Sequence, residues 1–306
     1  MDPITLLDSF EIAKLPGARY VTTTRAQKKK IAATPPKPSG NAVKRFPIPK
    51  YLIKRDVDEY IRDADAALAR LRASNLDVKK GNMSAVTKTQ IINEADIVPL
   101  IDKYLVTPVK AAIDGLYEED FIVSSEISLD HARVDSALRI DRGSGNYQNI
   151  VLIELKNRTL LSPEVITNAL CEESDPKMHF LTTRDHAIYF IKQAAFYSKT
   201  YNTNFAVLCD YDTLVLVKFF DLNKNNRPQK AHVTVVRKFF RKALLGFLIE
   251  ASNGAELRKR VIKVDVEEGK EWYGEDDTIL YPSRPIVFIT LAIILSILFF
   301  FFKSLE

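Results

Sequence analysis

The chain is poor in the residues that build disulfide frameworks and zinc clusters. Its 306 residues include only two cysteines, Cys171 and Cys209, and four histidines scattered along the sequence. Two distant cysteines give no disulfide framework, and no Cys or His spacing is typical of a zinc site. A glycine-rich phosphate loop, a dinucleotide-binding fingerprint and an internal repeat are also missing from the sequence. The sequence therefore gives no support to zinc-dependent or common nucleotide-binding classes.

Long apolar runs are equally scarce, since only one stretch is long enough to cross a bilayer. Ile286–Phe302 reads IVFITLAIILSILFFFF, 17 residues without a charge. A spanning helix needs about 20 apolar residues, with about 17 as the lower limit. Its four consecutive phenylalanines leave no polar face, which disfavours a helix of a soluble domain. We therefore expect a transmembrane helix over residues 285–302, followed by a short tail, 303–306.

The position of this run predicts a single-pass, tail-anchored membrane protein. No apolar core follows the first charged residues, so no signal peptide is expected, and the N-terminal domain would face the cytosol or nucleoplasm. A strongly apolar span favours the endoplasmic reticulum or nuclear envelope. Its short length and its basic flanks, Arg284 and Lys303, leave the mitochondrial outer membrane as the alternative.

The net charge of +5 comes entirely from the front of the chain. Residues 1–50 carry ten Lys and Arg against three Asp and Glu, and the remainder carries 34 against 36. The Lys28-Lys29-Lys30 run and the prolines at 35, 36 and 38 predict a flexible arm over residues 1–50. Its plainest interpretation is a solvated tail. The alternatives are contact with nucleic acid or anionic lipid, and an import signal.

Behind the arm, the hydrophobic pattern outlines one large domain. Residues 51–85 comprise a linker and a short amphipathic helix, predicted over residues 56–71 from apolar positions at helical spacing. Residues 86–276 form the core domain, which is long enough to bury a sizeable hydrophobic core. A linker, 277–284, joins this domain to the apolar run.

Within the core domain the patterns predict a mixed α/β fold. A long amphipathic helix from a start at Asn93-Glu94 to Leu116 comes first, and three strands with short links then suggest a meander. A second helix and further strands follow. The predicted strands lie at 121–127, 133–138, 150–155, 205–209, 214–219 and 231–239, and the later helices at 185–202 and 240–251.

Two acidic residues and a lysine occupy neighbouring strands of this meander. Glu154 and Lys156 are two residues apart, so their side chains leave the same face, and four apolar residues before Glu154 predict a central strand. Asp135 lies in the preceding strand. Two carboxylates can hold a hard divalent cation, and a lysine beside them can orient or deprotonate a water. The plainer interpretation is a surface ion pair and an exposed polar residue.

This order of elements, with Asp135, then Glu154 and Lys156, then Gln193 on the second helix, resembles the PD-(D/E)xK nuclease superfamily. The resemblance covers residues 93–220 and implies a restriction-endonuclease-like αβββαβ core. Asp135 matches the first acid of the family, Glu154 and Lys156 its (D/E)xK pair, and Gln193 its helix-borne glutamine. Glu94 matches the acid that some branches carry on the first helix.

The resemblance implies metal-dependent hydrolysis of a phosphodiester with Mg²⁺ or Mn²⁺. Asp135 and Glu154, aided by Glu94, would ligate the metal, while Lys156 would position the water or stabilise charge on the phosphate. Gln193 would orient Lys156 or the scissile strand. DNA is the expected nucleic-acid partner, by analogy with the family.

Two other hypotheses remain open. In one, the nuclease fold survives as a catalytically idle binding or scaffolding module tethered to a membrane. The near-neutral charge of the chain beyond the arm favours it, because duplex-binding proteins usually display a basic surface. In the other, the chain is an unrelated α+β membrane protein. A structure in which Asp135 and Glu154 lie far apart would reveal this.

Overall fold

The computed structural model describes residues 4–16, 19–20, 43, 46–74, 90–91, 94–129, 132–157, 160–177, 186–220, 222 and 229–261. All of them belong to one compact unit, Met1–Val264. The predicted linker at 277–284, transmembrane helix at 285–302 and tail lie outside the described residues. Among those that are described, no helix is both long enough and apolar enough to cross a membrane.

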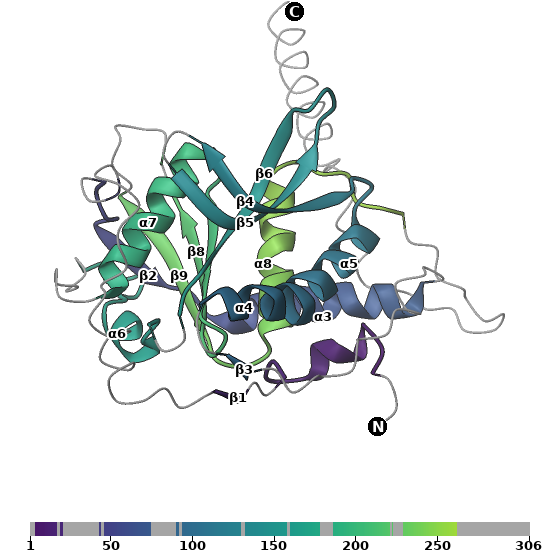
Figure 1. Ribbon diagram of the computed structural model, residues 1–306, viewed down its shortest axis with the longest axis horizontal. Coiled ribbons are helices and arrows are strands. Elements are labelled where there is room, and N and C mark those ends of the chain that lie inside the picture. Colours follow the sequence, from purple (N-terminus) through teal and green to yellow (C-terminus); the bar gives the residue numbers. More distant parts are fainter. Residues whose placement is uncertain are drawn as a thin grey trace, which may run out of the picture. The chain divides into compact units, whose positions relative to one another are not determined.

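A seven-stranded mixed sheet forms the centre of the fold, which confirms the predicted mixed α/β class (Figure 1). Its strand order is β2-β9-β8-β7-β6-β5-β4. The strands are β2 (Tyr51–Lys54), β4 (Phe121–Leu129), β5 (Ala132–Asp141), β6 (Tyr147–Leu155), β7 (Phe205–Cys209), β8 (Leu214–Phe219) and β9 (Lys230–Val236). A separate pair of short strands, β1 (Arg19–Tyr20) and β3 (Gln90–Ile91), is parallel.

The sheet combines local antiparallel hairpins with two parallel pairs. Strands β4, β5 and β6 form the predicted antiparallel meander, and β7, β8 and β9 form another. The turn between β5 and β6 contains Gly143 and Gly145 with φ of 93° and 74°, which glycine adopts without steric cost. The β6–β7 and β2–β9 pairs are parallel. Parallel pairing requires a crossover, and α7 (His186–Thr200) lies in the one between β6 and β7.

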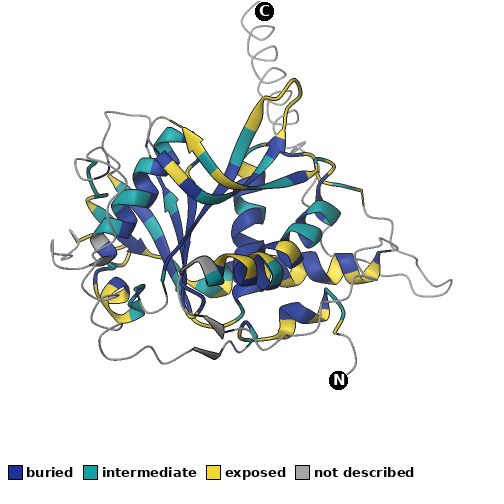
Figure 2. Cartoon of the chain, viewed as in Figure 1, coloured by how far each residue is buried: buried dark blue, intermediate teal, exposed yellow. Residues whose placement is uncertain are grey.

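Helices cover both faces of the sheet, and the central strands are buried between them (Figures 1 and 2). One face packs against α3 (Val57–Ala73), α4 (Glu94–Ile101), α5 (Thr107–Leu116) and α8 (Phe240–Gly254). The other packs against α6 (Pro163–Asn168) and α7. Strand β6 is central, as predicted, and its residues 150–155 are all buried. A charged side chain near the end of β6 therefore enters a largely dry environment.

Helices α3 and α8 approach closely enough to exclude any side chain at Gly246. A Cβ at this position would come within 2.0 Å of the Tyr60 carbonyl oxygen. The ring of Tyr60 packs edge-on against Phe247, with 5.5 Å between the centroids. The helix predicted at 56–71 is thus built into the core through this contact.

The N-terminal residues correct one prediction. The sequence predicts a flexible arm over residues 1–50, but residues 4–16 pack against the core through Leu7 and Phe10, which are 3% and 0% exposed. The buried guanidinium of Arg241 donates to the carbonyl oxygen of Ser9 at 2.7 Å. Residues 4–16 read ITLLDSFEIAKLP and are mostly apolar, unlike the basic and proline-containing stretch further along the arm, and this apolar composition explains their burial. Most of the remaining arm lies outside the described residues.

The long helix predicted from residue 93 to 116 is divided into three pieces. Helix α4 contains Pro99, a π-helical turn follows at Asp102–Val106, and α5 begins at Thr107 with Pro108 in its first turn. Prolines remove backbone donors, so the regular ladder of an uninterrupted α-helix cannot be maintained here. The apolar spacing was predicted from the sequence, but the change of helix type was not.

Candidate active site

Glu154 and Lys156 form a buried ion pair at the end of β6. Their side chains are only 9% and 7% exposed, and the Lys156 ammonium donates to Glu154 Oε1. The ammonium also lies 5.5 Å from the centroid of the Phe190 ring, on α7. The pair therefore faces the α7 side of the sheet. This burial contradicts the interpretation of Glu154 and Lys156 as a surface ion pair.

Gln193 reaches the same carboxylate from α7. Its Nε2 donates to Glu154 Oε1 at 2.9 Å and to the Tyr197 hydroxyl oxygen at 2.8 Å. Tyr197 lies one helical turn after Gln193 and is 2% exposed. The sequence pattern identified Tyr197 only as an apolar position of the helix. Its spacing of four residues from Gln193 was the available signal for this contact.

Asp135 lies beside the pair, on β5. The register pairs Ser136 with Ile153, so Asp135 and Glu154 occupy the next opposed positions of the two strands. Asp135 Oδ2 accepts a hydrogen bond from the Leu155 backbone N–H at 2.7 Å. This places the two acids on adjacent strands. We call Asp135, Glu154, Lys156 and Gln193 the β6 site.

The electrostatic environment of Asp135 is mixed. Burial raises its pKa above the ordinary aspartate value, and the Leu155 N–H, Lys156 and Arg133 oppose that rise. Glu126 adds to it. A carboxyl group in such surroundings is stabilised in its charged form when a cation approaches.

The donor set of the β6 site fits a hard divalent cation in kind, since Asp135 and Glu154 supply carboxylate oxygens from adjacent strands. Glu94 is the first residue of α4, and its side chain lies outside the described part. Within the described residues, no group of three or more Asp, Glu, His or Cys side chains is arranged to hold a metal.

A further buried acid, Asp210, follows the end of β7, close to Lys156. The Lys156 N–H donates to the Cys209 carbonyl oxygen, and Asp210 follows directly. Asp210 Oδ1 accepts from the Thr213 N–H at 2.8 Å, and Oδ2 accepts from the Leu161 N–H at 3.1 Å. Burial raises the pKa of Asp210 to about 6, against the effect of these hydrogen bonds. The residue joins the segment after Lys156 to the β7–β8 turn.

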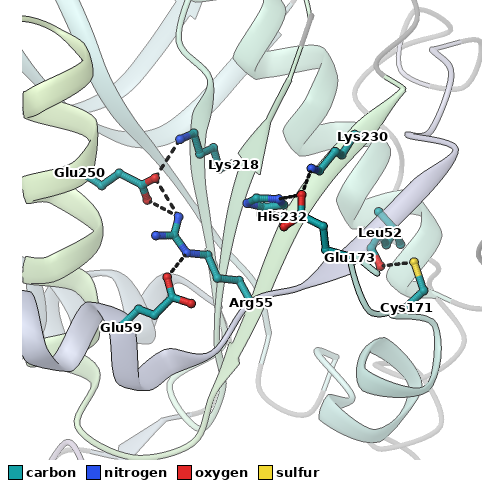
Figure 3. A network of polar contacts seen from close by, with 9 residues as sticks. All are labelled: Leu52, Arg55, Glu59, Cys171, Glu173, Lys218, Lys230, His232 and Glu250. Atoms are coloured by element: carbon teal, nitrogen blue, oxygen red, sulfur yellow. Dashed lines mark hydrogen bonds and ion pairs between the residues drawn. The ribbon is translucent and has the colours of Figure 1, made fainter. Parts of the chain in front are cut away.

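A second network of charged side chains lies on the opposite face of the sheet (Figure 3). Arg55 donates to both oxygens of Glu250 on α8, at 2.7 and 2.8 Å, and to Glu59 at 2.9 Å. Lys218 on β8 donates to Glu250 at 2.8 Å. We call Arg55, Glu59, Lys218 and Glu250 the α8 network. It ties together the start of α3, the end of α8 and the middle of the sheet.

The edge strand β2 has its own polar contacts. The segment around Cys171 pairs with β2 through the Cys171 N–H and the Leu52 carbonyl oxygen at 2.9 Å. Glu173 then accepts from Lys230 and lies 3.8 Å from His232 (Figure 3). These contacts cover part of an edge that would otherwise be open to another strand.

Comparisons with known proteins leave the chain without an assigned family. No protein-family model, no curated protein and no solved structure matches it.

Proposed function

We propose that the protein is a membrane-anchored, metal-dependent nuclease that hydrolyses phosphodiester bonds of nucleic acid, with DNA as the favoured substrate. The observation that carries this proposal is the β6 site. Its lysine and glutamate are buried together and bonded to a glutamine from a separate helix, while an aspartate lies at the next position across the sheet. The order of elements, α4–α5, β4, β5, β6, α7 and β7, supports a restriction-endonuclease-like core.

The proposed role of each residue follows from its position. Asp135 and Glu154 would hold Mg²⁺ or Mn²⁺, and Glu94 is proposed as a further ligand. Lys156 would orient the attacking water and stabilise charge on the phosphate, and its burial preorganises the ammonium. Gln193 restrains Glu154 through its amide donor. When bound, the ion would polarise the phosphate and lower the pKa of a water.

The membrane part of the proposal rests on the sequence of Ile286–Phe302, which carries no charge. The nuclease domain would then act beside a membrane, in the cytosol or nucleoplasm. Extraction of membranes at alkaline pH tests this anchor. The protein should stay in the membrane fraction, and a variant in which Ile294 and Leu295 are replaced by Arg should be released.

The test of the activity is cleavage of single- and double-stranded DNA and RNA by the full-length chain in detergent, with Mg²⁺ or Mn²⁺. We expect metal-dependent cleavage that Lys156→Ala and Glu154→Gln each reduce by at least about a hundredfold. Arg55→Ala is the control, since Arg55 belongs to the α8 network on the other face. It should keep its activity at a temperature where it is folded.

A second candidate function is a catalytically idle binding or scaffolding module. The internal pairing of Lys156 with Glu154 favours it, because this pair also acts as a structural contact between β6 and α7. Under this candidate, a folded preparation would neither cleave any substrate nor bind Mn²⁺. Calorimetric titration with Mn²⁺ separates the two functions, because only the nuclease loses metal affinity on Asp135→Asn.

A further inference from the structure

An exposed arginine lies immediately beside the β6 site. Arg133 lies two residues before Asp135 on β5, and its side chain is exposed. The positive charge of Arg133 acts on Asp135, whose pKa it lowers, in opposition to the larger effect of burial. An exposed arginine two residues from Asp135 can contact a phosphate group that reaches this carboxylate.

The present partner of Arg133 is a carboxylate on the neighbouring strand. Its Nη2 donates to Glu126 Oε1 at 2.6 Å. The two side chains are 62% and 68% exposed. Such exposed pairs contribute little to stability, so Arg133 can readily exchange Glu126 for another anion.

The backbone at Glu126 shows that its conformation is imposed. Glu126 has φ of 51° inside β4, although the ladder continues on both sides with Ser125 opposite Ser136 and Ile127 opposite Val134. A non-glycine residue in this region is strained and persists only where its surroundings enforce it. Thus the Glu126 carboxylate holds the Arg133 guanidinium, two residues before Asp135 in the chain.

We propose that Arg133 binds a backbone phosphate of the nucleic acid, with Glu126 as the counter-ion that it exchanges for this phosphate. This inference rests on the proposed nuclease function. Arginine suits the role, because its planar guanidinium can donate two parallel hydrogen bonds to a phosphate. Binding would then place the phosphodiester next to Asp135 and Glu154, where repulsion between the acids and the phosphate needs a compensating positive charge.

The chain offers a closely matched control. Arg237 donates to Glu164 at 2.6 Å, with side-chain exposures of 57% and 66%. This pair has nearly the same length and exposure as Arg133–Glu126, but Arg237 follows β9, at the far side of the sheet. Loss of either ion pair should cost the fold equally little.

The experiment is an equilibrium binding titration of a fluorescent DNA duplex and single strand, in EDTA, at several salt concentrations. We expect Arg133→Gln to weaken binding about tenfold at low salt and to reduce the slope of log affinity against log salt by about 0.9. Arg237→Gln should match the unaltered chain. Glu126→Gln should tighten binding about twofold, because it frees Arg133 from its competitor.

The two substitutions are expected to change the DNA affinity in opposite directions, and this distinguishes a role in binding from a purely structural role. A purely structural ion pair would give the same effect when either half is removed. The inference is overturned if Arg133→Gln behaves like Arg237→Gln, or if Glu126→Gln weakens binding as much as Arg133→Gln does. In both cases the unaltered chain still binds and cleaves, so the proposed nuclease function stands. An unaltered chain that binds no nucleic acid overturns both.

Discussion

The β6 site and the α8 network lie on opposite faces of one sheet, and they differ in charge balance. The α8 network sets two cations, Arg55 and Lys218, against two carboxylates, Glu59 and Glu250. The β6 site sets one cation, Lys156, against two carboxylates and is more deeply buried at its ion pair. A balanced network is complete as a structural contact. An excess of carboxylates at the end of the central strand β6 instead leaves the site able to attract a cation.

The largest loss of stability is expected for a substitution at Lys156 in the β6 site. Lys156→Met should lower the free energy of unfolding by about 3–5 kcal/mol, because it leaves the Glu154 carboxylate buried without its ammonium partner. Urea denaturation at pH 7 measures the loss. The double variant Lys156→Met, Glu154→Gln should recover most of the stability and remain inactive in cleavage. Recovery of activity in the double variant would show that the pair is only structural.

The next largest effect is expected at the α3–α8 contact that supports the α8 network. Gly246→Ala places a methyl group 2.0 Å from the Tyr60 carbonyl oxygen, which the backbone can relieve only by moving the helices apart. We expect a loss of about 3 kcal/mol in thermal or urea unfolding. Gly254→Ala is the control, since an added Cβ there meets nothing within 4 Å. Equal stability of the two variants would contradict the close packing.

The α8 network itself is expected to affect stability without affecting chemistry. Burial would raise the pKa of Glu250, but hydrogen bonds from Lys218 and Arg55 lower it overall. Its contribution is therefore present above the ordinary glutamate pKa and is lost as pH falls through the lowered one. Glu250→Gln should cost about 1–3 kcal/mol at pH 7 and less in acid, with cleavage unchanged. A variant equally destabilised at both pH values would contradict this linkage.

The smallest effect, and one of opposite sign, is expected at Asp135. Its pKa is raised, chiefly by burial, so its ionisation opposes folding, and stability falls as pH rises through the raised pKa. Asp135→Asn should therefore be more stable than the unaltered chain at pH 7, by about 0.5–1 kcal/mol, while losing cleavage and Mn²⁺ affinity. The difference in stability should vanish near pH 4. If Asp135→Asn is instead less stable than the unaltered chain at pH 7, the ionised Asp135 carboxylate stabilises the fold.

The sequence predicted well those parts of the fold that depend on local pattern. The meander of β4, β5 and β6 follows from alternating apolar residues and short turns, and the spacing of Glu154 and Lys156 placed both on one face. Strand β2 was missed, because its four residues pair in parallel with β9, 179 residues further along the chain (Tyr51 with Lys230). Such a partner leaves no periodic signal near Tyr51–Lys54.

The contacts that complete the candidate site were also beyond local pattern. The hydrogen bond from the Leu155 N–H to Asp135 depends on where the β5–β6 ladder ends. Glu250 was part of a predicted helix, yet its partners Arg55 and Lys218 come from two other elements. Tertiary placement decides such contacts, and the residue types alone do not reveal it.

The parallel pairing of β2 with β9 has a consequence for synthesis of the chain. β2 is made early, but its hydrogen-bonding partner and Arg241, which holds the Ser9 carbonyl oxygen, belong to the last quarter of the folded unit. Contacts between residues so far apart in the sequence form slowly during folding. The N-terminal residues and β2 therefore lack these partners until β9 and α8 have emerged from the ribosome. A nascent chain is thus expected to stay protease-sensitive at β2 and in the N-terminal residues until nearly the whole unit has been translated.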